Sequence, residues 1–327
     1  MEALLKIYPE AATPKQPGTP GSLIGKQKSA SVLDVLLNRT FSLEVQNDSG
    51  STALHIAALN GHKAFVEKLI DQLFNVNIKD DSGNTALHLA AWSGHVDIMR
   101  MLIKAGSAVN EQNAEGNTPL HYVAQYGKEK APALLLLESK ANPVLRNKMN
   151  ETPLDTAARF GRTEVVSVLA TANILGQIYK KGMRPVSSPL HLAARNGHTE
   201  VIKILLQAGV VINSINHEGN TALHEATQFG KRAVVLQLLQ GGASVKVLND
   251  IGQTPLQLFN VFNSKSQNQN NPIYAMLHGT RRHRWEESLV CPIAELGPAA
   301  PFLGGRRGVP GLQRRRRAPT RRRWRRS

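Results

Sequence analysis

Short segments with small apolar residues alternate along this chain with segments that carry pairs of large apolar residues. Ala57 and Ala58 belong to the first kind, and Leu69 and Ile70 belong to the second. Turn residues bound both kinds of segment, and apolar runs of this length between turns are consistent with short helices. Because small side chains let neighbouring elements approach closely, we expect pairs of helices packed against further pairs.

The alternation has a fixed period, which the motif Thr-Ala-Leu-His makes visible. The motif or a variant of it recurs about every 33 residues, beginning at Thr52, Thr85, Thr118, Thr152, Ser188, Thr221 and Thr254. A period of this length predicts a stack of supersecondary units, each covering the apolar face of its neighbour. The steps before Thr152 and Ser188 are longer, so we place one extra residue within 128–140 and a longer connector at 174–186.

Residues that favour turns and helix ends surround each motif. A polar turn with glycine precedes it, as at Gly83, because a tight turn commonly needs a positive φ angle. Threonine is a good helix N-cap, and proline directly after it suits the first helical position. Glycine followed by histidine, as at Gly94 and His95, is typical of a left-handed helix end. A second helix follows, and Pro132 is predicted to lie in the first turn of one of them.

The ends of the chain depart from this pattern. Residues 1–29 are rich in Pro, Gly and Lys and are predicted to form a disordered arm. A helix predicted at 30–38 takes the place of a second helix and would cap the stack as a half-repeat. The last unit keeps its first helix and is predicted to continue into a polar loop at 264–271 and a shortened helix at 273–277.

The turn, the Thr-Pro-Leu-His-type start, the alanine pair, Gly-His and the leucine pair in one 33-residue frame resemble the ankyrin repeat. The resemblance implies an all-α solenoid of helix-turn-helix repeats with short β-turn or hairpin fingers, six to seven repeats and an N-terminal half-repeat cap. The repeat domain would span 30–279. Its predicted repeats are 47–79, 80–112, 113–146, 147–182, 183–215, 216–248 and 249–279.

Several segments are also similar to ankyrin-repeat scaffolds of the Odin and Caskin type. They are 57–62, 90–92, 109–113, 124–127, 151–155, 193–198 and 222–226. Those scaffolds carry SH3, sterile-alpha-motif or phosphotyrosine-binding modules after their repeats, and we identify no such module in this sequence. The resemblance implies a scaffold or adaptor in signalling, which without those modules would sequester its partners.

Eleven histidines raise the question of a metal site. Five occupy the last position of the motif and three follow the closing glycine: His55, His88, His121, His191 and His224, then His62, His95 and His198. Equivalent residues of stacked repeats lie about 8–10 Å apart, too far to share a zinc ion through bonds of about 2 Å. We therefore expect structural histidines. The ankyrin resemblance implies that the motif imidazole bonds to neighbouring backbone and ties turn to helix.

Other features suggest catalysis only weakly. Residues 21–26 differ from a phosphate-binding loop by one missing spacer, with Gln27 in place of the hydroxyl residue. His224 and Glu225 lack the second histidine of the zinc-protease motif, and Cys291 has no partner organised around it. We predict a non-enzymatic protein with no catalytic residues, no cofactor and no metal.

The candidate binding residues are the two that precede the closing glycine of each first helix. By analogy with the family, these positions face the inner groove beside the turn tips. The predicted site comprises Trp92, Ser93, Gln125, Tyr126, Arg159, Phe160, Arg195, Asn196, Gln228 and Phe229. Aromatic residues and arginine are enriched in binding hot spots. An alternative stays open, in which the aromatic rings pack between adjacent short helices.

The tips of the turns form a second candidate surface, because their chemistry varies from repeat to repeat. We expect solvent exposure and partner contact at Asp81, Asn84, Glu115, Asn117, Lys148 and His217. Together, the helix positions and the turn tips predict a surface for a partner protein or peptide.

Positive charge is concentrated at one end of the chain. Residues 281–327 contain 14 arginines, no lysine and three glutamates, and so carry +11 of the net charge of +16. The tail, 280–327, is predicted to be disordered, and three interpretations stay open. It is an alternative terminal exon or out-of-frame read, a nuclear import signal, or a nucleic-acid contact in which arginines bind phosphates and Trp324 stacks on bases. In each case the tail would contact polyanions or import receptors without sequence specificity.

The remaining features favour an intracellular protein. No run reaches the roughly 18 apolar residues that a membrane span needs, and the first residues lack the features of a secretory signal. A single cysteine excludes an internal disulfide framework. We expect a cytoplasmic monomer, with the nucleus as an alternative location. The predicted function is a scaffold or adaptor that binds an intracellular protein or peptide; the alternative is a nuclear or nucleic-acid-associated protein acting through its tail.

Overall fold

The described part of the chain is built from helices. The computed structural model describes residues 45–72, 74–178, 187–262 and 271–279. Within them lie fifteen helices, α3 to α17, and the β-type pairing found there is an isolated antiparallel bridge between Ile215 and Thr221. The prediction of an all-α array is confirmed.

Some predicted segments cannot be compared with the structure. The arm at 1–29, the half-repeat helix at 30–38, and the tail at 280–327 lie outside the described residues, as does nearly all of the loop predicted at 264–271. The boundaries of the repeats also remain a prediction, although each helix pair described below falls within one predicted repeat.

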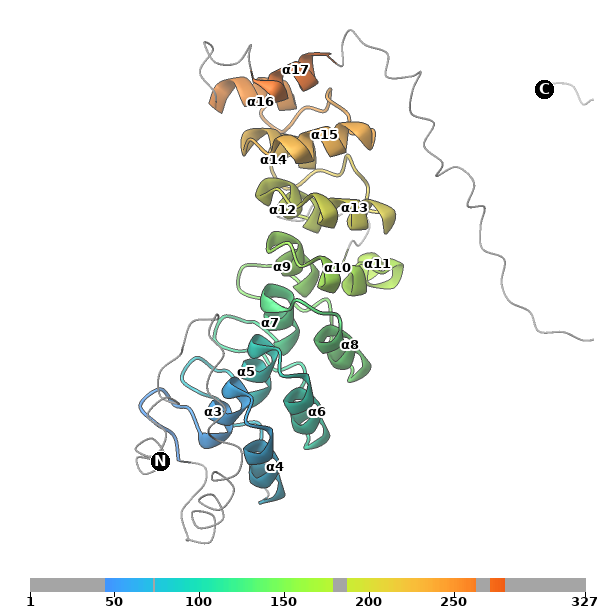
Figure 1. The fold of residues 1–327 in the computed structure, drawn as a ribbon. Helices are drawn as coiled ribbons and strands as arrows, with labels where there is room; N and C mark the ends of the chain where they lie inside the picture. The colour runs from blue at the N-terminus through green and yellow to red at the C-terminus, as the bar shows by residue number, and fades with distance from the viewer. Residues whose placement is uncertain (1–44, 73, 179–186, 263–270, 280–327) are drawn as a thin grey trace, which may run out of the picture. The chain divides into compact units, whose positions relative to one another are not determined.

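Seven helices, called the inner helices, begin directly after the motif threonine or serine. They are α3 (Ala53–Asn60), α5 (Ala86–Ser93), α7 (Pro119–Tyr126), α9 (Pro153–Arg159), α12 (Pro189–Asn196), α14 (Ala222–Gln228) and α16 (Pro255–Phe262). Each contacts the next inner helix along the chain (Figure 1).

Seven further helices, called the outer helices, follow them. They are α4 (Lys63–Asp71), α6 (Val96–Lys104), α8 (Ala131–Glu138), α10 (Thr163–Leu169), α13 (Thr199–Gln207), α15 (Arg232–Gln240) and α17 (Pro272–Gly279). Each outer helix contacts its own inner helix and the outer helix of the neighbouring repeat. Pro132 lies in the first turn of α8, as the sequence predicts.

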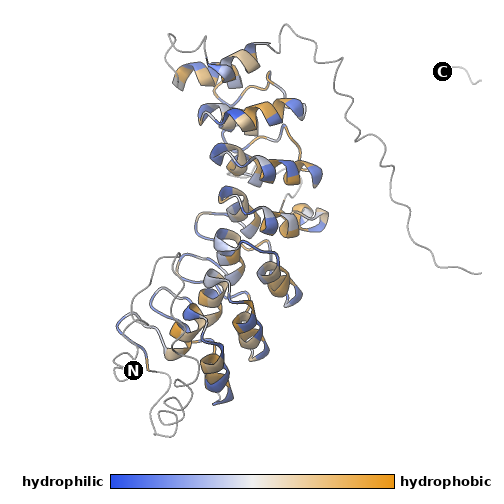
Figure 2. Ribbon diagram, in the orientation of Figure 1, coloured by the Kyte–Doolittle hydropathy of each residue, from blue (hydrophilic) through white to orange (hydrophobic). Residues whose placement is uncertain are grey.

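One continuous core runs between the two rows of helices. In the second repeat, Leu87, Ala90 and Ala91 of α5 and Ile98 and Leu102 of α6 are almost completely buried. The alanines leave room for the neighbouring inner helices, so consecutive inner helices pack closely. Figure 2 shows hydrophobic and hydrophilic residues together in these helices, as expected for elements with one buried side.

A finger-like turn precedes each inner helix where the structure describes it. In the second repeat, the Asp80 amide donates to the Asn84 carbonyl at 2.9 Å and closes the turn. Gly83 has a φ of 74°, and a Cβ at this position would lie 2.8 Å from the Ala114 nitrogen in the next turn. Glycine is therefore required both by the backbone conformation and by the close approach of the next repeat. In the fourth repeat Asn150 takes this place, with a φ of 60°.

Adjacent turns are joined by backbone hydrogen bonds. An amide of one turn donates to a carbonyl of the preceding turn at 2.9–3.2 Å, in the pairs Asp81–Ser49, Ala114–Ser82, Lys148–Glu115 and Asp250–Glu218. These bonds hold the turns at the same spacing as the inner helices.

The connector predicted at 174–186 differs from the expectation, because it begins with a helix. Helix α11 (Ala172–Ile178) follows α10, and its Ile174 and Leu175 are buried. Its first turn is supported by Thr171, whose carbonyl accepts from the Leu175 amide at 2.9 Å. The extra length of the fourth repeat therefore adds an apolar helix to the outer row and is not only a loop.

The packing of the two rows of helices predicts that two leucines of α8 contribute very differently to the free energy of unfolding. Leu136 is fully buried, whereas Leu134 is 44% exposed. Leu136→Ala is expected to lower the free energy of unfolding by about 2–5 kcal/mol, since it removes buried methyl groups and leaves a cavity. Leu134→Ala is expected to cost about 0.5 kcal/mol or less. Urea unfolding followed by circular dichroism measures both, and equal losses would contradict the packing.

Candidate partner-binding surface

The ten predicted site residues all lie at the surface, at the ends of inner helices. Each is exposed or partly exposed. The four aromatic side chains have nearly equal exposures, with Trp92 at 39%, Tyr126 at 38%, Phe160 at 36% and Phe229 at 39%. The helix ends thus present a row of half-exposed rings. We call the surface formed by these helix ends and the turn tips the inner surface.

In the second and third repeats the rings form a cluster. The centroid of the Trp92 ring lies 5.7 Å from that of Tyr126 and 6.4 Å from that of Tyr122, and the two tyrosines are 6.3 Å apart. These spacings are in the range of favourable aromatic pairs. The rings of this aromatic cluster pack on one another between adjacent inner helices and stay partly open to solvent, so the packing interpretation describes them and partner contact stays a prediction.

Tyr122 is a member of the cluster that sequence reasoning missed. Its hydroxyl donates to Asn84 Oδ1 at 3.0 Å and accepts from Asn113 Nδ2 at 3.1 Å. Burial, with a smaller contribution from Glu115, raises the pKa of Tyr122 to about 12. The available signal was its position four residues before Tyr126, which places both rings on one helix face.

In the fourth to sixth repeats, arginines cover the rings. The Arg159 guanidinium lies 5.0 Å from the centroid of Phe160, and that of Arg195 lies 4.4 Å from that of Phe229. Such cation–π contacts stabilise a half-exposed ring by about 0.5–2 kcal/mol. The second part of the inner surface therefore combines rings with arginines, whereas the first presents rings packed on one another.

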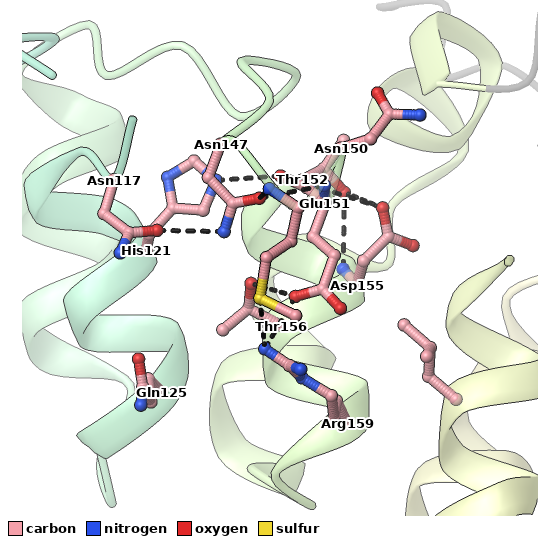
Figure 3. A network of polar contacts seen from close by, with 12 residues as sticks. Asn117, His121, Gln125, Asn147, Asn150, Glu151, Thr152, Asp155, Thr156 and Arg159 are labelled. Atoms are coloured by element: carbon pink, nitrogen blue, oxygen red, sulfur yellow. Dashed lines mark hydrogen bonds and ion pairs between the residues drawn. The ribbon is translucent and has the colours of Figure 1, made fainter. Parts of the chain in front are cut away.

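Buried carboxyl groups lie beneath these arginines. Arg159 Nη2 is 3.0 Å from Glu151 Oε2, and the side chain of Thr156 donates to the same oxygen at 3.5 Å (Figure 3). Burial raises the pKa of Glu151, and Arg159 opposes that rise. Burial likewise raises the pKa of Glu225, and Arg195 opposes it.

Two of the predicted turn-tip contacts are wrong. Asn84 and Asn117 are 7% and 8% exposed, so they are buried and do not face solvent. Asn84 Oδ1 accepts from Asn113 Nδ2 at 2.8 Å, and Asn117 Oδ1 accepts from Asn147 Nδ2 at 2.9 Å (Figure 3). A side-chain amide both donates and accepts, so these residues join successive turns.

The other four turn-tip residues are exposed, as predicted: Asp81, Glu115, Lys148 and His217. The turn tips therefore present acidic residues in the second and third repeats and a lysine in the fourth. Their varied chemistry adds to the inner surface at its edge.

The motif histidines join each repeat to the next. In the first repeat the Thr52 amide donates to His55 Nδ1 at 3.1 Å, so this nitrogen carries no proton. His55 Nε2 must then hold the hydrogen, and it donates to the Asn84 carbonyl at 2.9 Å. His88, His121, His191 and His224 make the equivalent pair of contacts.

Comparison with known proteins identifies this architecture. A family model described as ankyrin repeats, three copies, matches residues 23–113, 103–181 and 175–249. The chain belongs to the ankyrin-repeat family. Ankyrin repeats generally mediate protein–protein interaction, and the fold is typically a non-enzymatic interaction module.

Solved ankyrin-repeat structures are similar to this chain. The human ASB11 ankyrin repeat domain is 25% identical with a TM-score of 0.59, over 70% of this chain and 97% of that domain. The ankyrin repeat domain of Bcl-3, a member of the IkappaB protein family, is 25% identical with a TM-score of 0.57, over 71% of this chain and all of that domain. No curated protein sequence matches this chain.

The fourth ankyrin repeat has aspartate where the other described inner helices up to α14 have histidine. Asp155 Oδ2 accepts from the Thr152 amide at 2.9 Å and from the Thr152 hydroxyl at 2.8 Å, as a histidine Nδ1 would (Figure 3). Its other oxygen, Oδ1, is buried without a hydrogen-bond partner. Burial raises the pKa of Asp155 to about 6, although Thr152 and Arg146 oppose the rise.

Two other kinds of site, a metal site and a membrane span, are absent from the described residues. No three side chains of His, Cys, Asp or Glu among them are grouped as a metal site requires. In the same part of the chain, no helix combines the length and apolar character of a membrane span.

The buried carboxyl of Asp155 predicts a pH-dependent stability. Because its folded pKa is raised from 3.8 to about 6, its contribution is fully present below about pH 4 and is lost as the pH rises through about 6. Asp155→Asn keeps the acceptor and removes the charge. The variant should therefore gain on the order of 2–3 kcal/mol over the wild type between pH 4 and pH 7.

Urea unfolding at pH 4, 5, 6 and 7 measures this gain. The histidines are common to both proteins, so their titration cancels in the difference. Asp71→Asn, at an exposed carboxylate of α4, is the matched control and is expected to differ little from the wild type throughout. A difference for Asp155→Asn that stays constant across this range would contradict the assignment.

Proposed function

We propose that this chain is a non-enzymatic scaffold or adaptor that binds a partner protein or peptide on the inner surface of its ankyrin repeats. The observation that carries the proposal is the row of half-exposed aromatic rings at the two positions before the closing glycine, which begins with the cluster of Trp92, Tyr122 and Tyr126. Rigid aromatic anchors set in a packed surface are typical binding hot spots.

The size of the surface supports the same proposal. A stable protein interface buries about 800 Å² on each partner, and we expect three or four adjacent repeats to provide that area. The predicted site residues run from α5 to α14, over five consecutive repeats. The surface is therefore long enough for an extended peptide or for one face of a folded partner.

The type of scaffold and its location are proposed from the amino-acid sequence alone. We propose a signalling scaffold of the Odin and Caskin type, on the segments named above, acting as a monomer in the cytoplasm. The arginine-rich end of this chain fits an alternatively spliced form. The similar solved domains, ASB11 and Bcl-3, support the fold and indicate no partner for this chain.

The proposal is tested by removing the aromatic cluster from the full chain. Trp92→Ala with Tyr126→Ala is expected to reduce capture of partner proteins from cell lysate at least tenfold, since hot-spot truncations cost about 2 kcal/mol or more. Quantitative mass spectrometry compares the variant with the wild type. Leu134→Ala with Leu236→Ala, at exposed positions of two outer helices, is the control and should leave capture unchanged.

Circular dichroism must show an intact melting transition in each variant. If the double variant melts early, Ser93→Arg replaces it, because Ser93 is exposed next to Trp92. Equal capture by the wild type and a folded cluster variant would refute the proposed site.

A second candidate function rests on the 14 arginines of residues 281–327, which lie outside the described residues. We propose as the alternative a nuclear or nucleic-acid-associated role. If about eight phosphates are neutralised on duplex DNA, the logarithm of the binding constant should fall with the logarithm of salt at a slope near −7. Deletion of 281–327 is expected to abolish this binding in anisotropy titrations and to leave partner capture intact; loss of capture would favour the alternative.

A further inference from the structure

Charge is distributed unevenly between the two sides of the first three repeats. The turns and inner helices, residues 47–60, 80–93 and 113–126, contain four carboxylates and no lysine or arginine. The remaining segments of the same repeats, residues 61–79, 94–112 and 127–146, contain nine lysines and arginines and six carboxylates. The first set, called here the acidic strip, is negative in a chain whose net charge is +16.

The carboxylates of the acidic strip form no ion pairs within the part of the chain that the structure describes. Asp48, Asp81 and Glu115 are exposed, and Asp80 is partly exposed. None of the four forms an ion pair with any residue that the structure describes. Lys79, next to Asp80, pairs with Glu111 at 2.6 Å and not with the strip. Among the described residues, the strip therefore presents carboxylates without ion-pair partners in the repeats that hold the aromatic cluster.

The chain itself shows what an exposed ring at this position binds. Phe160 and Phe229 occupy the same repeat position as Tyr126, and each is covered by an arginine of its own inner helix or the preceding one, Arg159 or Arg195. No cation of the described residues covers Trp92 or Tyr126 in this way, although both rings are exposed to a similar degree. The second and third repeats thus offer rings and carboxylates without the arginine.

We propose that the acidic strip binds an arginine-bearing segment of the partner, with one guanidinium stacked on Trp92 and Tyr126 and further cationic side chains beside Asp81 and Glu115. This inference rests on the proposed function and specifies the chemistry of the partner. Arginine is the expected residue because its planar group stacks on rings and bonds carboxylates in a bidentate way.

An acidic segment on the other half of the inner surface is the competing occupant. The arginines of that half already have internal contacts, because Arg159 pairs with Glu151 at 3.0 Å and the Arg195 guanidinium lies 4.4 Å from the centroid of the Phe229 ring. An incoming carboxylate would have to displace these internal partners. The observations therefore favour a cationic ligand on the first half.

The test is a selection of random 12-residue peptides displayed on phage, using the immobilised full chain. The Trp92→Ala, Tyr126→Ala variant serves for counter-selection. Because it retains residues 280–327, peptides that bind the tail are removed. Retained peptides are expected to be enriched in arginine and depleted of Asp and Glu relative to the input. Retained peptides with no arginine enrichment, or with acidic sequences, would overturn the inference and leave the proposed function standing.

If no peptide distinguishes the wild type from the variant, both the inference and the proposed site fail. A peptide that binds the wild type and not the variant is synthesised again with each arginine replaced by citrulline, which keeps the shape of the side chain and removes its charge. This change is expected to weaken binding about 3- to 30-fold in anisotropy titrations. Undiminished binding of the citrulline peptide would contradict the stacked guanidinium.

Matched variants of the protein locate the contact. Asp81→Asn with Glu115→Gln is expected to weaken binding of the arginine peptide about 3- to 10-fold at low salt and to reduce its salt dependence. Glu67→Gln with Asp71→Asn, at two exposed carboxylates of the outer helix α4, removes the same number of charges and is the matched control, which should leave the affinity unchanged. An equal loss of affinity in both double variants would show that the peptide responds only to net charge and would overturn the inference.

Discussion

The structure depends on a buried, neutral imidazole that forms hydrogen bonds with two successive repeats. Its Nδ1 accepts from the residue that begins its own inner helix, and its Nε2 donates to a carbonyl in the turn of the next repeat, as His55 does with Thr52 and Asn84. A protonated ring would lose the acceptor, and burial opposes that charge by lowering the pKa of His88, His121 and His191 to about 4. One side chain thus sets both where a helix begins and where the next turn lies.

This common register leaves the ends of the inner helices free to vary. The side chains of the residues before the closing glycine take no part in the bonds of the motif histidines, so tryptophan, tyrosine and arginine can stand there without disturbing the stack. The result is a surface with two chemistries on one frame. The second and third repeats hold rings together with carboxylates that form no ion pair with any other described residue, and the fourth to sixth hold rings covered by Arg159 and Arg195.

Sequence patterns predicted the structural features that depend on residues close together in the chain. The inner helices begin after threonine or serine, and Gly61, Gly94 and Gly197 end them in the left-handed conformation, because capping and φ preferences act over a few residues. Features set by contact between repeats were missed. Asn84 is polar and stands in a turn, yet it is buried because Asn113, 29 residues away, satisfies its oxygen. Tyr122 and helix α11 likewise become recognisable only when neighbouring elements cover them.

Asp155 has a consequence for how such an array can grow. A carboxylate reproduces the accepting half of the imidazole but has no hydrogen for the following turn. Gene duplication of any unit with histidine would insert a repeat whose imidazole donates a hydrogen bond to the turn of the repeat after it. A copy of the fourth unit would instead insert a second junction without this hydrogen bond. Lengthening by tandem duplication is therefore structurally favoured on either side of the fourth repeat and disfavoured at it.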